Sequence, residues 1–328
     1  MCWFHNQKAA DFRFPFRQSL PCCLQLQESL RMISRFSLSS QIFVLLCCTV
    51  CGADISCRNE EGEAVDWFIV YKLPKYRIDD IGSGVEYMYL DSSKEGWEMS
   101  KYTINSSQGA ITNTLNQLYM GKEYKSNTSV YALYNDAPPD LKYIQKYGHT
   151  KAKQLVYLYP RFYNCSVPAA FSADLPQLAQ LCADSKPQLS SNKRMEQLFS
   201  AGGEKFVSFA KSENFVDDIY TGWVAQELGA DLLVESWQRQ GHDLPSNCSL
   251  AKHTMNIKKI QLPRSILFYS HYDHSKWCVS RLYEDQVTCL GDLNREMGQL
   301  WRGGGLICSS NPLIYKAFRQ VVDWYIQC

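Results

Sequence analysis

A short apolar run at residues 42–50, IFVLLCCTV, decides which part of this 328-residue chain can form a folded domain. Arg35 supplies a basic flank before the run, and the small residues of 51–53 follow it. This order of basic, apolar and small residues predicts a secretory signal peptide at 32–53. The run is shorter than the roughly 20 residues of a membrane-spanning helix, and no other stretch approaches that length. A single membrane span is the minor alternative.

Residues 1–31 precede the predicted signal peptide and show neither hydrophobic periodicity nor a targeting pattern. We interpret them as an N-terminal extension of unclear role, produced by a start upstream of a usual start at Met32. The extension is left out of the fold prediction.

Eight cysteines remain after cleavage at residue 53, an even number with wide and irregular spacing: Cys57, Cys165, Cys182, Cys248, Cys278, Cys289, Cys308 and Cys328. The remaining sequence has no C-x-x-C pair, so the spacing favours disulfides over a zinc site. Four N-x-[ST] sequences follow the signal peptide, at Asn105, Asn127, Asn164 and Asn247. Together these features predict a glycosylated, disulfide-bonded protein of the secretory pathway.

The composition is that of an ordinary folded protein, with 45% hydrophobic and 20% charged residues. Such a chain can bury a large core in one domain or in two half-domains. The formal charge is +1, and removing residues 1–53 leaves −2 because that segment carries more basic than acidic side chains. Any binding site for a polyanion must therefore be a local cluster of positive charge.

Hydrophobic patterns predict a mixture of strands and helices, and hence a mixed α/β or α+β sandwich. The expected strands are 65–73, 86–90, 129–134, 231–237, 256–262 and 265–269. The expected helices are 108–119, 170–183, 190–201 and 217–229, with a break at Gly202 and Gly203.

The pattern Y-x-H-[ST]-K occurs twice, at 147–151 and 272–276. Its histidine and lysine pairs are His149 with Lys151 and His274 with Lys276. In a strand, residues two apart point to the same face, so each motif would place an imidazole beside an ammonium group. Lysine can bind phosphate oxygens, and histidine can attack phosphorus or deliver a proton. The spacing alone leaves open an alternative, in which each motif is a surface strand with solvated polar side chains.

Two further segments follow the second motif: GDLN, which ends at Asn294, and RGGG at 302–305. An asparagine amide and the backbone amides of a glycine-rich turn could bind phosphate oxygens near His274. For RGGG alone, an ordinary turn is the better interpretation. We expect structural roles for the remaining histidines after the first motif, His242, His253 and His271.

Seven segments, in this order, resemble the deoxyribonuclease II family: DISCRNEEGEAVDWFIVYKLPK, LYNDAPP, YGHTK, PSNCS, DHSKWC, TCLGDLNR and RGGGLIC. The segments ISCRNEEG and FAKSENFVDDIY are most similar to the beta branch of that family. The resemblance covers 54–152 and 154–328, and it is far more specific than either H-x-K motif.

This resemblance implies a phospholipase D-like fold, in which two similar halves each give one H-x-K motif to a central cleft. The first half would be 54–155 and the second 156–328. The implied catalytic residues are His149, Lys151, His274, Lys276 and Asn294. Aromatic residues beside the motifs, such as Trp277 and Tyr147, could pack on a sugar or base, although core burial is the commoner fate.

The implied activity is that of an acid endodeoxyribonuclease, lysosomal or secreted, that needs neither metal nor cofactor. His149 would attack phosphorus to give a phosphohistidine, His274 would protonate the departing 5′ oxygen, and water would release a 3′-phosphate end. The substrate would be DNA, and the pseudo-dimeric chain could pair again as a homodimer.

The chain departs from the family after Lys151, where the family continues with a long apolar stretch and this sequence joins Ala152 and Lys153 directly to Gln154. Several dozen residues are expected to be missing, which would expose strand edges and leave Cys57 free or mispaired. The implied disulfides are Cys248 with Cys328 and Cys289 with Cys308, while Cys165 with Cys182 is a guess. Two alternatives follow: a catalytically impaired secreted glycoprotein isoform with residual nucleic-acid binding, and a phospholipase D-like phosphodiesterase with another substrate.

Overall fold

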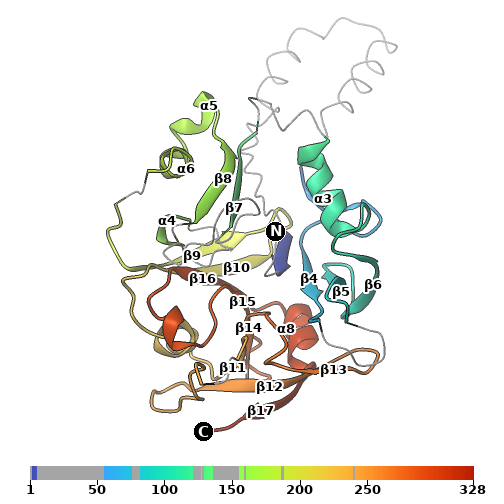
Figure 1. The fold of residues 1–328 in the computed structure, drawn as a ribbon, viewed down its shortest axis with the longest axis vertical. Helices are drawn as coiled ribbons and strands as arrows, with labels where there is room; N and C mark the ends of the chain where they lie inside the picture. Colours follow the sequence, from blue (N-terminus) through green and yellow to red (C-terminus); the bar gives the residue numbers. More distant parts are fainter. Residues whose placement is uncertain are drawn as a thin grey trace, which may run out of the picture.

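The structure is a computed structural model that describes residues 2–5, 55–75, 82–120, 127, 129–135, 155–158, 160–185, 188–238 and 241–328. Two unequal sheets and several short helices make up these residues, which confirms the expected mixed α and β composition (Figure 1). In the described part of the chain, every helix is too short or too polar to cross a membrane.

The larger sheet has nine strands, all from the C-terminal part of the chain. Its order is β13-β12-β11-β14-β15-β16-β10-β9, and β17 also pairs with β12. Neighbouring strands are antiparallel except β11 and β12, which are parallel. The strands are β9 (Lys193–Phe199), β10 (Lys205–Lys211), β11 (Leu232–Glu235), β12 (Thr254–Leu262), β13 (Ile266–Tyr269), β14 (Trp277–Ser280), β15 (Thr288–Gly291), β16 (Gly304–Ser309) and β17 (Val322–Ile326).

The smaller sheet has four strands in the order β1-β4-β5-β6. These are β1 (Cys2–His5), β4 (Phe68–Lys72), β5 (Glu86–Asp91) and β6 (Glu98–Thr103). β1 pairs with β4 in parallel, so residues 2–5, which precede the predicted signal peptide, form an edge of this sheet. Two ribbons complete the strands: β2 (Cys57–Arg58) with β3 (Ala64–Val65), and β7 (Tyr131–Asn135) with β8 (Arg161–Ser166).

The helices are short. They are α3 (Ala110–Tyr119), α4 (Leu155–Leu158), α5 (Ala169–Ser172), α6 (Pro176–Cys182), the π-helix η2 (Tyr220–Val224), α7 (Ala225–Leu228), the 3-10 helix η3 (Met297–Gln299) and α8 (Pro312–Arg319). At the start of α8, the Asn311 side chain accepts hydrogen bonds from the backbone N–H groups of Leu313 and Ile314, at 2.9 and 3.2 Å. Such an N-cap, followed by proline at the first turn, explains why the helix begins there.

The two faces of β4 belong to different cores. Ile69 and Tyr71 pack in one large core with residues of the nine-stranded sheet and α8, including Trp277 and Phe318. The alternate residues, Phe68 and Val70, pack in a second core on the other face of the strand. Because successive side chains of a strand point to opposite faces, this aromatic and β-branched strand is buried on both sides and joins the two sheets.

Most of the predicted elements are present, including the strands at 65–73, 86–90 and 129–134 and the helix at 108–119. The prediction of a helix at 190–201 is wrong, because 193–199 form β9 and pair with β10. Gly203, with φ of +89°, lies in the turn that folds β9 back onto β10. The expected helix at 170–183 is divided into α5 and α6, with Pro176 at the start of the second helix.

Three predicted disulfides are present, Cys165–Cys182, Cys248–Cys328 and Cys289–Cys308. Cys57 is also disulfide-bonded, so of the two expectations for this residue, a free or a mispaired thiol, the free thiol is wrong. Cys278 is a buried free cysteine in the core, and burial raises the pKa of its thiol.

Candidate active site around His274

The second H-x-K motif lies where three neighbouring strands of the large sheet have their ends side by side, and this row of strand ends is called the edge below. β14 begins at Trp277, and its neighbours β11 and β15 end at Glu235 and Gly291. Trp277 is paired with Glu235 on one side and with Leu290 on the other. Because both pairings are antiparallel, the segments after β11, before β14 and after β15 lie side by side at this edge.

His274 lies in the loop before β14 and stacks on Trp237, which follows β11. The two ring centroids are 4.0 Å apart and the ring planes differ by 23°. The Trp237 indole also donates a hydrogen bond from Nε1 to the His271 carbonyl at 3.1 Å. The His274 side chain is half-buried, so it is the partly exposed member of a buried polar group.

Lys276 is fully buried, and its Nζ donates a hydrogen bond to the His274 carbonyl oxygen at 2.7 Å. The prediction that His274 and Lys276 share one face of a strand is wrong, because 273–276 form a loop and β14 begins only at Trp277. Asp273 causes the loop: its Oδ1 accepts the backbone N–H of Ser275 at 2.9 Å, which closes a local turn. The buried Lys276 ammonium group therefore places a positive charge against the backbone of the motif.

Asp273 also connects the motif to the smaller sheet. Its Oδ2 accepts hydrogen bonds from the Tyr71 hydroxyl of β4, at 2.5 Å, and from the Ser275 hydroxyl. Ser275 Oγ lies 3.0 Å from the Tyr71 hydroxyl. Burial raises the pKa of Asp273, and these hydrogen bonds act in the opposite direction. The loop that carries His274 is thus held by residues from both sheets.

Glu235 is a second buried carboxyl group at this edge and accepts a hydrogen bond from Ser270 Oγ at 2.6 Å. Burial raises its pKa well above the ordinary value, and the charge of Asp273 raises it further. Lys258 and Lys276 oppose that shift without cancelling it. Glu235 therefore keeps its proton to a higher pH than an exposed glutamate does.

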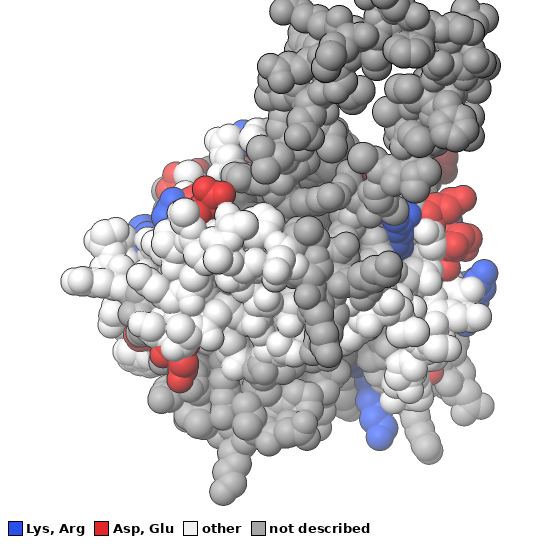
Figure 2. All heavy atoms as spheres, turned by 90° about the horizontal axis from the view of Figure 1, so that it is seen from above, with Lys and Arg blue, Asp and Glu red and all other residues white. Residues whose placement is uncertain are grey.

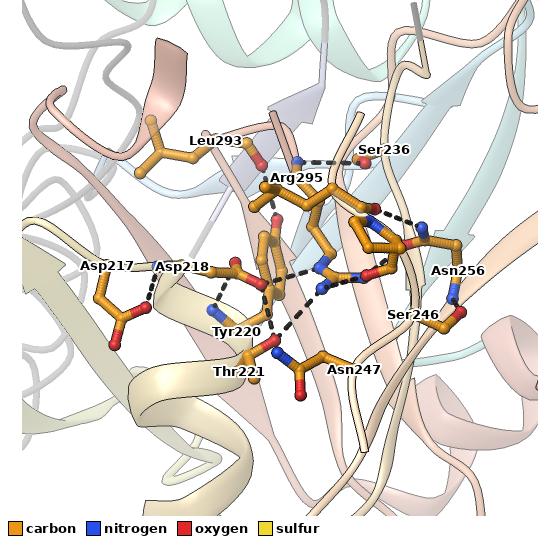
Figure 3. A network of polar contacts seen from close by, with 12 residues as sticks. Asp217, Asp218, Tyr220, Thr221, Ser236, Ser246, Asn247, Asn256, Leu293 and Arg295 are labelled. Carbon is orange, nitrogen blue, oxygen red and sulfur yellow. Dashed lines mark hydrogen bonds and ion pairs between the residues drawn. The ribbon is translucent and has the colours of Figure 1, made fainter. Parts of the chain in front are cut away.

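Asn294 lies in the loop after β15 and is 7% exposed. None of the described residues donates a hydrogen bond to its Oδ1. The next residue, Arg295, is 2% exposed and forms the centre of a polar network (Figure 3). Its Nε lies 2.9 Å from Asp218 Oδ2, and its Nη1 donates to Asn256 Oδ1 at 2.5 Å.

The same network holds the Asn294 loop from two further sides. Arg295 Nη2 donates to Thr221 Oγ1 at 3.3 Å and to the Pro245 carbonyl at 3.0 Å. The Tyr220 hydroxyl of the π-helix donates to the Leu293 carbonyl at 2.9 Å. The Arg295 backbone N–H donates to Ser236 Oγ at 3.3 Å, beside Trp237. Figure 3 shows Leu293, Ser236 and Asp218 on different sides of Arg295.

The RGGG segment does not form the glycine-rich turn that either interpretation expected. Gly304 begins β16, and Gly304 and Gly305 are both paired with β10. A Cβ on Gly305 would lie 2.4 Å from the Phe209 carbonyl oxygen, and one on Gly304 would lie 2.4 Å from Leu293 Cγ. These glycines therefore permit close packing inside the sheet. Trp277 is 1% exposed and belongs to the core, which is the commoner of the two outcomes expected for it.

His149, Lys151 and Tyr147 lie outside the described residues. Of the predicted site residues, the structure describes His274, Lys276 and Asn294, which lie in loops at neighbouring strand ends. In the described ranges no group of three His, Cys, Asp or Glu side chains could hold a metal ion. On the face drawn in Figure 2, the basic and acidic side chains of the described residues are scattered in small groups over a mostly uncharged surface.

Sequence reasoning missed four residues of this site: Tyr71, Trp237 and the roles of Glu235 and Asp273. One signal was available, because Glu235 is a lone carboxyl group in an otherwise apolar strand. A buried carboxyl group in such a strand needs a partner or a neutral state. The stack of Trp237 on His274 joins residues 37 positions apart and has no local sequence signal.

Comparison with known proteins identifies similar chains. The family model of deoxyribonuclease II matches in two pieces, residues 56–153 and 151–328. Deoxyribonuclease-2-beta of Homo sapiens is 39% identical over 333 residues, with 84% of this chain and 92% of the relative covered. Deoxyribonuclease-2-alpha of Sus scrofa is 32% identical over 338 residues (84% and 91% covered), and Plancitoxin-1 of Acanthaster planci is 28% identical over 333 residues (84% and 92%).

Proposed function

The chain belongs to the deoxyribonuclease II family, and from this premise we propose that it is an acid endodeoxyribonuclease that cleaves DNA without a metal ion or cofactor. One observation supports the proposal: His274, the buried Lys276 and Asn294 lie in loops at neighbouring strand ends. These are an acid–base group, a fixed positive charge and an amide, which are the groups that phosphodiester cleavage requires.

The proposed reaction has two steps. His149 attacks phosphorus, a bond forms between the imidazole nitrogen and phosphorus, and the bond from phosphorus to the 5′ oxygen breaks as His274 gives that oxygen a proton. Water then attacks the phosphohistidine and gives its proton to His274, which releases a 3′-phosphate end and restores both histidines. The assignment of His149 as nucleophile and His274 as acid follows the family resemblance.

Lys151, Lys276 and Asn294 stabilise the transferred phosphoryl group in this scheme. The burial of Lys276 supports its role, because a cation with little solvent around it interacts more strongly with developing negative charge. Its hydrogen bond to the His274 carbonyl sets the position of that charge relative to the motif backbone.

An acidic optimum follows from the proton donor. An imidazole with an ordinary pKa of about 6.5 is protonated mainly below neutral pH. The buried carboxyl groups of Glu235 and Asp273 also favour function at acidic pH, because burial raises the pKa of both groups. We therefore place the protein in the secretory pathway, lysosomal or secreted, with a cleaved signal peptide and N-linked glycans. Of the predicted glycan sites, Asn105 and Asn127 are exposed.

We also propose the phospholipase D-like arrangement of two similar halves that meet at one cleft. Its support is the repeated Y-x-H-[ST]-K pattern and the hydrogen bond from Tyr71 of the first half to Asp273 of the second. The division at residue 155 falls at the start of α4, and β7 pairs with β8 across it. The two halves are therefore joined by pairing as well as by packing.

A missing internal segment after Lys151 is part of the proposal. The family model matches in two pieces that meet at 151–153, which is the predicted junction. The alignment with the human relative runs over 333 positions but includes only 84% of the 328 residues of this chain. Many residues of the relative are therefore aligned with gaps in this chain. The same observation favours the second candidate, a catalytically impaired secreted glycoprotein with residual nucleic-acid binding.

A plasmid-cleavage assay at about pH 5 with EDTA separates the two candidates. The full chain, secreted from cultured cells, is expected to cleave the plasmid and to leave 3′-phosphate ends, which a phosphatase-dependent end-labelling reaction detects. A folded, disulfide-bonded protein that leaves the plasmid intact would favour the impaired glycoprotein, and cleavage that requires added metal would contradict the proposed mechanism. Sequencing the transcript across codons 151–154 tests the missing segment.

A further inference from the structure

We propose that Trp237 is a positioning residue for His274: its indole face fixes the plane of the imidazole and stabilises the ring when it carries the proton for the leaving oxygen. This inference rests on the proposed role of His274 as the acid, and it adds to that role a residue outside both H-x-K motifs.

The stack is the first argument. A centroid separation of 4.0 Å with 23° between the planes places the two rings face to face at van der Waals distance. An imidazolium over an indole is also a cation–π pair, for which tryptophan is the most favourable aromatic residue. The indole thus favours the charged form of His274 over the neutral form. It also restricts rotation of the imidazole out of the stacked plane.

Trp237 is itself held in place, which a positioning residue requires. Its Nε1 donates to the His271 carbonyl at 3.1 Å, so the indole is oriented by the same loop that carries His274. Its backbone follows β11, and the neighbouring Ser236 Oγ accepts the Arg295 backbone N–H at 3.3 Å. The Arg295 network of Figure 3 therefore connects Ser236, the residue before Trp237, to the Asn294 loop.

The charges around the motif explain why such support is needed. Lys276 of the motif is a buried cation that disfavours a second positive charge at His274. Two buried carboxyl groups flank the motif, Asp273 in the same loop and Glu235 of β11, and burial raises the pKa of both. Lys258 of β12 donates to Gln238, and the exposed His271 and Tyr272 directly precede Asp273. Among these groups, the indole stabilises the imidazolium without being titrated itself.

The experiment measures His274 directly in the full secreted chain by histidine-selective NMR, with the resonances assigned by comparison with His274→Asn. Trp237→Leu removes the ring, and Trp237→Phe keeps a stacked ring but loses the Nε1 hydrogen bond. We expect Trp237→Leu to lower the pKa of His274 by about half a unit to one and a half units. Trp237→Phe should retain most of the native value. The exposed Trp324, in β17, provides the control variant Trp324→Leu.

In active protein, the limb of the kcat–pH profile that reports the acid should move by the same amount in Trp237→Leu, with little change in KM. An unchanged His274 pKa in folded Trp237→Leu would overturn the inference. If Trp237→Leu does not fold, the native protein still decides: the His274 ring protons must show an upfield ring-current shift that Trp237→Phe reduces, and its absence would also overturn the inference. Because NMR needs no catalysis, an inactive native chain would count against the proposed function alone.

Discussion

The two sheets of the molecule differ in where their strands come from. All nine strands of the large sheet lie between residues 193 and 326, and the Cys248–Cys328 and Cys289–Cys308 disulfides link parts of the chain between 248 and 328. In the four-stranded sheet, β4 has β5 on one side and the distant β1, residues 2–5, on the other. β1 precedes the predicted cleavage site, so cleavage would leave that side of β4 without β1 as its partner.

The difference concerns the site as well as the sheets. The loops that carry His274 and Asn294 are each held by buried side chains from several elements, Tyr71 for the first and Asp218, Thr221 and Asn256 for the second. A chemical group is kept in a productive position by such supporting contacts. The loops of His274 and Asn294 are therefore supported by residues far apart in the sequence, and four predictions test how far the whole protein depends on them.

The largest expected effect is on catalysis. His274→Asn should lower kcat at about pH 5 by roughly 10³-fold or more, because the leaving oxygen loses its proton donor. His149→Asn should do the same if both halves contribute to one site. Plasmid nicking rates measure both, with His253→Asn as the control, since that histidine is distant in sequence and pairs with Asp231 at 3.9 Å. Activity that survives in His274→Asn but not in His149→Asn would assign the chemistry to the first half alone.

The next prediction compares disulfides. Replacing both Cys248 and Cys328 by serine should lower the free energy of unfolding by about 4.5 kcal/mol, because the bond closes 80 residues and restricts the unfolded chain. Replacing Cys165 and Cys182, which close 17 residues, should lower it by about 3 kcal/mol. Urea titrations under non-reducing conditions measure the difference. Equal losses would show that loop length does not govern the stability of this chain.

A loss of comparable size is expected from the Arg295 network. Arg295→Met should lower the free energy of unfolding by upward of about 3 kcal/mol, since it leaves the buried Asp218 without its cation. Arg281→Met is the matched control. Arg281 Nη1 lies 3.5 Å from Asp231, its side chain is 40% exposed, and its loss should change stability by less than about 1 kcal/mol. The same urea titration serves, and a loss in Arg295→Met no greater than in the control would contradict the interpretation of Figure 3.

The smallest effect concerns Glu235, whose pKa is raised by burial. The folded state binds this proton more tightly than the unfolded state, so the stabilisation is fully present below the unfolded pKa of about 4.5 and is lost as the pH rises through the folded pKa. Glu235→Gln should therefore be more stable than the native protein at neutral pH, by on the order of 1 kcal/mol, and should match it near pH 4. Thermal unfolding from pH 4 to 8 measures this, and parallel profiles for the two proteins would refute it.

Several features could be read from the sequence because their signals are local. The alternating and aromatic runs predicted β4, β5 and β7, and the family segments identified the motif at 272–276. The error at 190–201 has a physical cause: the residues of β9 carry a polar, helix-compatible pattern, and pairing with β10 outweighs that preference. The H-x-K spacing likewise misplaced Lys276, because the Asp273 turn removes the motif from the strand.

By itself, the sequence indicated the family, the mixed composition of strands and helices, and three cysteine pairings, one of which, Cys165 with Cys182, was a guess. Only the tertiary structure decided that Trp237 stacks on His274, that Glu235 and Asp273 are buried at the same edge, and that Tyr71 reaches Asp273 across 202 positions. The reason is physical. Hydrophobic periodicity records which side of a strand is buried, whereas strand order and register determine which side chains meet there.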